Sequence, residues 1–293
     1  MYISLSRHYD REGPSSSLAF GKYGMNRYII LLLMCCSGGW TLTRSASVEA
    51  QTQGGGTISG HVRLAAPAPA NPIIRLRVDP MCAKVNTGKR PVHEFVLRSA
   101  DGGLANAFVD LEGTFPKAPV SNKPATLDQR NCIYTPRVLG ARAGEVLKVT
   151  NNDPLLHNVH SQSTQNPFNF SQPQAGMTRD VQLKGPDVMM RITCDVHSWM
   201  VAYVGVETHP YFAVSGADGS FQIAGVTPGP RTVRVWHERY GQLTQKVTVA
   251  AGKTVNVDFS YTGNEKPSKT RLQELTLPLD DPSGVEIRLV SAK

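Results

Sequence analysis

The chain has 293 residues, 40% hydrophobic and 18% charged, which is enough for one large or two modest folded domains and argues against wholesale disorder. The formal net charge is +8. The basic residues are spread along the sequence without interleaved aromatic residues, so we expect no nucleic-acid partner.

The first fifty residues have the pattern of an export signal. Arg27 precedes an apolar run, residues 28–36, that is too short to cross a bilayer. Small residues follow, and Val48-Glu49-Ala50 has the pattern of a cleavage site. A start of translation at Met25 would give a signal of ordinary length. We therefore expect residues 1–50 to be a signal peptide, and the mature protein to be periplasmic or extracellular and not an integral membrane protein.

Short strand-like segments follow a flexible leader at residues 51–56. Thr57–Leu64 alternates apolar and polar residues, as a half-buried strand does, and Ala65–Pro72 is an Ala/Pro linker. Turn residues separate the later segments, and no window has a sustained 3.6-residue period, so helices should be short or absent. The sequence predicts an all-β sandwich or barrel. Further strands are expected at residues 92–97, 107–111, 134–139, 146–150, 180–183, 188–193 and 200–206.

A second, smaller β-unit is predicted to begin at residue 208. It contains strand patterns at residues 221–223, 232–236, 246–249 and 255–259, separated by turns rich in Gly and Pro. So few strands suit a small sandwich-like module that packs against its neighbour. The predicted module covers residues 208–262, and residues 263–293 form a polar tail that we leave unassigned.

Two segments carry residues suited to metal chemistry. His157 follows a predicted strand and a proline-containing turn. Cys194, His197 and Met200 have the spacing Cys-x-x-His-x-x-Met between two apolar strands. Cu(I) favours soft sulfur and Cu(II) favours imidazole nitrogen, and two imidazoles, a thiolate and a weak axial thioether serve both states. The pattern predicts one copper ion.

At these residues the sequence resembles the cupredoxin, or blue-copper, family, and its Cys-x-x-His-x-x-Met loop is similar to that of amicyanin. The resemblance implies that His157, Cys194, His197 and Met200 are the ligands of one type 1 copper site. It also implies that Asn158 connects the two loops near the Cys194 sulfur. A cupredoxin transfers single electrons, so the expected partner is a redox protein.

The resemblance covers about residues 55–207, and its specific motifs lie within about residues 145–206. It implies that residues 57–207 form a Greek-key cupredoxin-like β-sandwich. The sequence departs from the family in two places. Asp195-Val196 stands between Cys194 and the loop histidine, where cupredoxins commonly have a proline, and Ile192 replaces the familiar aromatic residue. An anionic Asp195 near copper should stabilise Cu(II) and lower the reduction potential.

Residues 208–262 resemble a different family. The turn Gly219-Ser220 before Phe221, and Pro228-Gly229-Pro230 before an alternating strand, are similar to carboxypeptidase regulatory-like, transthyretin-type domains. The resemblance implies a structural or binding module.

The cysteine count agrees with a metal-bound thiolate. Five cysteines become three when Cys35 and Cys36 leave with the signal, so one thiol lacks a partner in an oxidising compartment. If Cys194 binds metal, Cys82 and Cys132 remain as a candidate disulfide. A lipoprotein anchored through Cys35 or Cys36 is the alternative, and it is disfavoured because the residue before them is not small.

Two other readings stay open. His157, His160, Cys194 and His197 form the donor set of a tetrahedral zinc site, although that reading gives Met200 no role. A structural or carbohydrate-binding β-module with a non-redox metal is the alternative from another class. The sequence lacks the motifs of zinc peptidases, serine hydrolases and phosphate-binding loops, so we expect no enzymatic activity.

Overall fold

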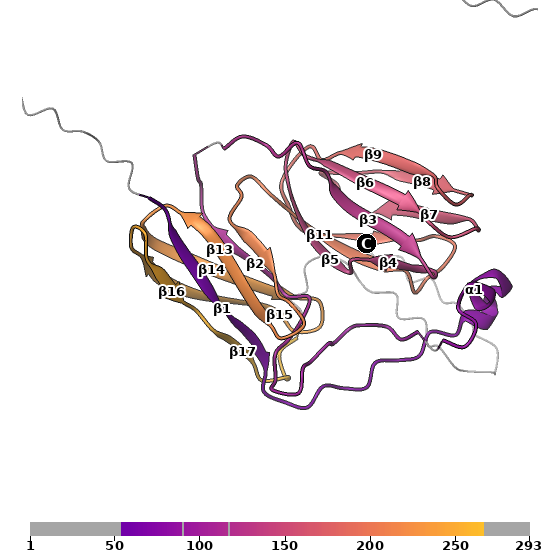
Figure 1. The fold of residues 1–293 in the computed structure, drawn as a ribbon, viewed down its shortest axis with the longest axis horizontal. Helices are drawn as coiled ribbons and strands as arrows, with labels where there is room; N and C mark the ends of the chain where they lie inside the picture. The colour runs from indigo at the N-terminus through magenta and orange to yellow at the C-terminus, as the bar shows by residue number, and fades with distance from the viewer. Residues whose placement is uncertain (1–53, 90, 117, 267–293) are drawn as a thin grey trace, which may run out of the picture. The chain divides into compact units, whose positions relative to one another are not determined.

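The computed structural model describes residues 54–266 except 90 and 117. The expected signal peptide and residues 267–293 of the expected tail lie outside this range. Strands dominate the described residues, and the helices are short (Figure 1). The elements in chain order are β1 (Gly56–Leu64), the 3-10 helix η1 (Leu76–Val78), α1 (Pro80–Val85), β2 (Phe108–Glu112), β3 (Ala125–Arg130), β4 (Ile133–Thr135), β5 (Val138–Arg142), β6 (Val146–Asn151), β7 (His157–Ser161), β8 (Asn169–Gln172), β9 (Thr178–Gln182), β10 (Asp187–Thr193), β11 (Val201–Glu207), β12 (Phe212–Val214), β13 (Ser220–Val226), β14 (Gly229–His237), β15 (Gly241–Val249), β16 (Thr254–Asn256) and β17 (Phe259–Tyr261).

The first group of strands forms two sheets around one core. One sheet has the order β5-β11-β10-β7-β8 and the other β4-β3-β6-β9, so neighbours in a sheet are often distant in the chain. Both sheets contribute to one buried hydrophobic cluster, which includes Leu127 and Val149 from one sheet and Val159, Ile192 and Val204 from the other. Alternating side chains bury one face of each sheet, and the result is the predicted cupredoxin-like β-sandwich.

The second group of strands also forms two sheets, and it recruits strands from the N-terminal part of the chain. β1 pairs with β13, β16 and β17, and β2 lies between β12 and β14. The sequence prediction assigns residues 57–64 and 107–111 to the domain 57–207. In the structure, the strands at these residues belong to the sheets of the second group. Alternation identifies a strand and its buried face, but it does not name the partner strand.

Two predicted strands differ in the structure. Residues 92–97 form no strand, and Val92 takes part only in an isolated bridge with Ile73. Residues 134–139 are divided into β4 and β5 at Pro136, whose nitrogen has no hydrogen to donate to a ladder. The expectation of short helices agrees with α1, which has six residues.

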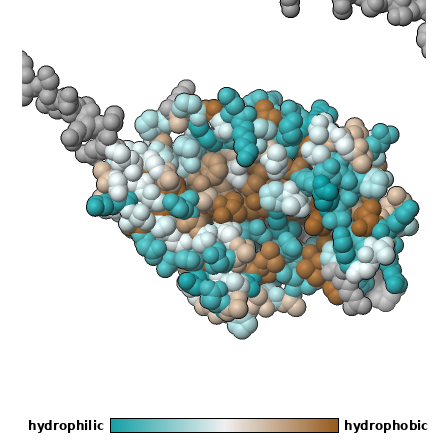
Figure 2. Space-filling view, in the orientation of Figure 1, coloured by the Kyte–Doolittle hydropathy of each residue, from teal (hydrophilic) through white to brown (hydrophobic). Residues whose placement is uncertain are grey.

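The surface of the described residues has a mixed character. Hydrophilic and hydrophobic residues are intermixed on the face that Figure 2 shows. Neither of the described helices has the length and apolar composition that a membrane span requires.

A disulfide joins Cys82 in α1 to Cys132, which precedes β4. The two residues are 50 positions apart, so the bond removes much of the loop-closure entropy of the unfolded chain. Replacing both cysteines with serine should lower the free energy of unfolding by about 2–5 kcal/mol. Urea unfolding of the variant and the parent, followed by tryptophan fluorescence, measures this loss. An unchanged midpoint would contradict the prediction.

A buried carboxylate pair links the two sandwiches. Asp110 on β2 and Glu207 on β11 both bind the guanidinium of Arg234 on β14, with Nε–Oδ1 2.9 Å to Asp110 and Nη2–Oε1 3.3 Å to Glu207. Burial raises the pKa of Glu207 to about 8, and the neighbouring Asp110 carboxylate adds to the effect. Glu207 therefore keeps a proton in the folded protein at pH values where an unfolded Glu has lost it.

This proton predicts a stability that depends on pH. Between the ordinary Glu pKa and about 8, the folded state binds more protons than the unfolded state, so the free energy of unfolding falls as pH rises and levels off above that window. The Glu207→Gln variant keeps a neutral hydrogen-bond donor at every pH. Its free energy of unfolding should therefore lack the part of the decrease that comes from Glu207. Urea unfolding at pH 5, 7 and 9 tests the prediction. If the free energy of unfolding changed equally with pH in the parent and the variant, the prediction would be contradicted.

Candidate metal centre

Backbone hydrogen bonds bring the two predicted ligand segments together. His157 begins β7, and Cys194 follows β10, which pairs with β7 in the same sheet. Cys194 N–H donates to the Met200 carbonyl at 3.2 Å, and Met200 N–H donates to the His197 carbonyl at 2.9 Å. These two bonds close the Cys194–Met200 loop, so the sandwich holds both segments at one end of adjacent strands.

Three predicted ligands converge in the interior. Nδ1 of His157 lies 3.1 Å from Nδ1 of His197, and Sγ of Cys194 lies 3.8 Å from the same His197 nitrogen. His157 is 0% exposed, His197 1% and Cys194 3%. One donor atom from each residue lies within 4.8 Å of the others. The loops that the sequence separates by more than thirty residues therefore share one buried centre.

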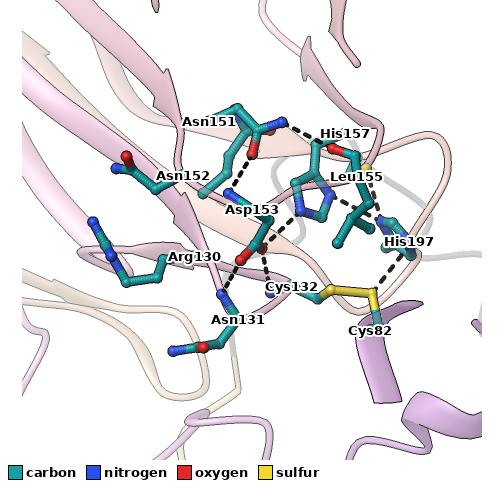
Figure 3. Close-up of polar contacts among 12 residues, drawn as sticks. Cys82, Arg130, Asn131, Cys132, Asn151, Asn152, Asp153, Leu155, His157 and His197 are labelled. Atoms are coloured by element: carbon teal, nitrogen blue, oxygen red, sulfur yellow. Dashed lines mark hydrogen bonds and ion pairs between the residues drawn. A yellow bond between two sulfur atoms is a disulfide. The ribbon is translucent and has the colours of Figure 1, made fainter. Parts of the chain in front are cut away.

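A carboxylate binds the outer nitrogen of each imidazole. Nε2 of His157 lies 2.9 Å from Oδ2 of Asp153, and Nε2 of His197 lies 2.9 Å from Oδ2 of Asp79 (Figure 3 labels the first three of these residues). An ionised carboxylate only accepts hydrogen bonds, so each Nε2 carries the hydrogen. In the neutral imidazoles both Nδ1 atoms then present lone pairs to one another, an arrangement that a cation between them stabilises.

The two carboxylates are themselves fixed by backbone groups. Asp153 accepts hydrogen bonds from the N–H groups of Asn131 and Cys132, at 2.8 and 2.7 Å. Burial raises the pKa of Asp153, but the hydrogen bonds from His157 and these two N–H groups outweigh it, so the net pKa is lowered. Asp153 therefore stays ionised and keeps the His157 ring in one orientation.

Asp79 caps the N-terminus of α1. Its side chain accepts from the N–H groups of Met81 and Cys82, at 2.7 and 3.1 Å. The hydrogen bond from His197 lowers the pKa of Asp79, and the helix N–H groups add to this effect against the burial penalty. The cap therefore places an anion against His197, and α1 contributes to the burial of that ring.

Asn158 lies between the two loops, beside the thiol. Its backbone N–H points to Sγ of Cys194 at 3.4 Å, and its side-chain oxygen accepts from Asp195 N–H at 3.1 Å. Burial raises the pKa of Cys194, but hydrogen bonds from the protonated form of the His197 ring and from the Asn158 N–H outweigh it, so the net pKa is lowered. The pocket thus favours the thiolate, which is the form that binds metal.

The spacing of the donor atoms fits one ion. An ion bonded to nitrogen at about 2.0 Å and to sulfur at about 2.3 Å, as zinc is, places N and S about 3.7 Å apart at an angle near 120°. It places two nitrogens about 3.1 Å apart at an angle near 100°. The observed separations are 3.8 Å between Cys194 and His197 and 3.1 Å between the two Nδ1 atoms. The residues therefore fit a metal ion without rearrangement.

The remaining candidates have different positions. Met200 is 0% exposed and belongs to the same buried cluster as Cys194. His160 is half-buried, and its Nδ1 lies 2.9 Å from Oδ1 of Asp195. Among the described His, Cys, Asp and Glu residues, the group around Cys194 contains only His157 and His197. The structure thus leaves His160 outside the donor set that the zinc reading needs.

Sequence reasoning missed Asp79 and Asp153. Asp153 lies four positions before His157 within an Asn/Asp/Pro-rich segment that we interpreted as a turn. Asp79 stands immediately before Pro80, and the two residues together form a helix N-cap signal. That signal predicts α1 but not its contact with His197, which is 118 positions away.

Comparisons with known proteins match only parts of the chain. The family model of the carboxypeptidase regulatory-like domain matches residues 201–262, beginning at β11 rather than at residue 208. No curated protein matches the sequence.

Similar solved structures cover about a third of this chain. One is the Cu(I) form of an amicyanin mutant, with 20% identity and a TM-score of 0.27 over 35% of this chain and 99% of that chain. A second is a purple cupredoxin from Nitrosopumilus maritimus, with 21% identity and a TM-score of 0.26 over 28% of this chain and 99% of that chain. A third is the copper-containing nitrite reductase from Thermus scotoductus SA-01, with 18% identity and a TM-score of 0.26. That match covers 32% of this chain and only 24% of the reductase chain. The copper in these names belongs to those proteins, and the chemistry of this site rests on its own residues.

Proposed function

We propose that this protein is an exported, non-enzymatic electron carrier with one type 1 copper site. The observation that carries the proposal is the convergence of two Nδ1 atoms and one thiol sulfur in a buried pocket, with separations of 3.1 and 3.8 Å. His157, His197 and Cys194 would be the equatorial ligands and Met200 the weak axial ligand. Copper bound there would alternate between Cu(I) and Cu(II) and so carry one electron.

The protein's contribution is to fix the donors before a metal enters. Asp153 and Asp79 hold the two rings with their Nδ1 lone pairs turned inward. The Asn158 N–H stabilises the thiolate of Cys194. Ligands with fixed positions need little rearrangement when the charge of the ion changes, and this favours rapid electron transfer.

The donor set favours copper over zinc. A structural zinc site is closed by four strong ligands, and here the buried group has one thiolate and two imidazoles. Met200, the residue that ends the ligand loop, is a thioether, which is a soft ligand suited to Cu(I). His160, the fourth zinc ligand in the alternative reading, faces Asp195.

Titration of the purified protein with Cu(II) tests the proposal directly. One equivalent should produce an intense visible band from the thiolate–copper bond, and a reductant should bleach it reversibly. A colourless complex would contradict the type 1 assignment, and tighter binding of Zn(II) in a direct competition would favour the alternative of a non-redox metal.

Replacing Met200 with leucine should retain copper binding and raise the reduction potential. The thioether is the weak axial donor, and its removal takes electron density away from Cu(II) more than from Cu(I). Direct electrochemistry of the Met200→Leu variant and the parent measures the shift. An unchanged potential would remove Met200 from the coordination sphere.

The surroundings of the site suit a short-lived contact with a redox partner. Leu156 and Val196, which immediately precede the two ligand histidines, are 43% and 48% exposed. Apolar side chains beside a buried redox centre favour brief docking. The expected export places such a partner in the periplasm or outside the cell.

A further inference from the structure

The Cys82–Cys132 disulfide lies directly beside the metal centre. Sγ of Cys82 is 3.5 Å from Nε2 of His197 (Figure 3). Sγ of Cys194 lies at the other ring nitrogen, Nδ1. Donor atoms of Asp79, Cys82 and His197 lie within 4.8 Å of one another, and those of Cys132, Asp153 and His157 do so as well. Each half of the disulfide thus belongs to a cluster of metal-binding side chains.

We propose that reduction of this disulfide creates a second metal site, in which the thiolates of Cys82 and Cys132 bind one Cu(I) ion. An exogenous dithiol supplies two electrons and two protons. The Cys82–Cys132 S–S bond breaks, two thiols form, and the dithiol becomes a disulfide. Binding of Cu(I) then releases the two thiol protons and forms two Cu–S bonds.

Side-chain hydrogen bonds to backbone carbonyls keep the two cysteine segments together without the disulfide. The side-chain amide of Asn86 donates to the Cys82 carbonyl at 2.9 Å and to the Asn131 carbonyl at 3.0 Å, so it bridges the two segments. The indole N–H of Trp199 donates to the Cys132 carbonyl at 2.9 Å. The reduced cysteines therefore stay near their present Cα separation of 5.8 Å, from which two thiolates can reach one ion.

The chemistry of the pocket selects a soft monovalent ion. Cys82 and Cys132 are both 0% exposed, and thiolates prefer Cu(I) to harder ions. The side-chain carboxyl groups of Asp79 and Asp153 stand beside the two sulfur atoms and offer oxygen atoms toward a cation there. Nε2 of His197, whose hydrogen is donated to Asp79, would lie next to the second ion without binding it, while Nδ1 faces the first site. The imidazole ring would then lie between the two sites.

Anaerobic Cu(I) titration against the colorimetric chelator bicinchoninate tests the inference. Protein reduced with dithiothreitol and then desalted should bind one Cu(I) more per chain than oxidised protein. The Cys82→Ser/Cys132→Ser variant should show no such increment. Copper X-ray absorption of a reduced Cys194→Ser variant should show an ion bound by two sulfur atoms.

The increment on reduction, rather than the total, tests this second site, so a failure of the type 1 proposal remains distinguishable. Thiol counting must find two additional thiols after reduction, and near-UV circular dichroism must retain the folded signal. No increment in such a protein would overturn the inference. Loss of the fold on reduction would also overturn it, because the preformed site would not exist.

Discussion

Replacement of Cys194 with serine should abolish the visible absorption of the copper-loaded protein and weaken copper binding by more than about 100-fold. The thiolate is the one strong sulfur donor among the three convergent atoms, and its bond to copper is the source of the expected band. Serine keeps the size of the side chain but offers a poorly acidic hydroxyl. Optical titration with Cu(II) and competition with a chelator of known affinity measure both effects.

Two variants control for changes unrelated to the ligand. The Cys82→Ser/Cys132→Ser variant removes the other two cysteine sulfur atoms of the described residues and should keep the band. The His160→Ala variant should also keep the band, because His160 faces Asp195. The His157→Ala variant should lose the band, because His157 belongs to the donor group of Cys194. A Cys194→Ser protein that still develops the full band would show that the thiolate lies elsewhere.

The second large effect concerns a residue that does not touch the metal in our account. Asp153→Asn should lower copper affinity about 10–100-fold, the loss typical of residues that orient a ligand histidine. The amide of asparagine can donate to Nε2 of His157, which favours the tautomer with the hydrogen on Nδ1. That hydrogen would point at His197 and occupy the position of the ion. Chelator competition measures the affinity.

The matched control is Asp180→Asn. Asp180 pairs with Lys148 on the surface, with Nζ–Oδ1 3.0 Å, and its loss removes the same charge far from the ligands. Equal affinities for Asp153→Asn and the parent, with both proteins folded, would contradict the orienting role. An NMR spectrum that resolves the ring hydrogens of His157 would show whether the tautomer has changed.

The sequence predicted the local features well. The alternation of Thr57–Leu64 predicted a strand, and the spacing between Cys194 and Met200 predicted a tight ligand loop. Both inferences depend on the order of neighbouring residues, which strand geometry and loop closure constrain directly. The pairing of Cys82 with Cys132 followed from the odd number of cysteines and the assignment of Cys194 to the metal, and the structure contains it.

Features that depend on distant partners could not be read in the same way. β1 pairs with strands more than 150 positions later, and Asp79 reaches His197 across 118 positions. Polarity and turn propensity predict that Asp79 caps a helix, but they contain no information about which side chain packs over that helix. The same reason explains why the sequence did not single out Glu207, since its raised pKa comes first from burial and then from Asp110 on another strand.

A crystal structure of the copper-loaded protein, with anomalous scattering measured at the copper edge, tests the central claim most directly. Our account predicts one strong peak bonded to Nδ1 of His157, Nδ1 of His197 and Sγ of Cys194 in the oxidised protein. A peak on the Nε2 side of either ring, or copper bound without the Cys194 sulfur, would contradict it.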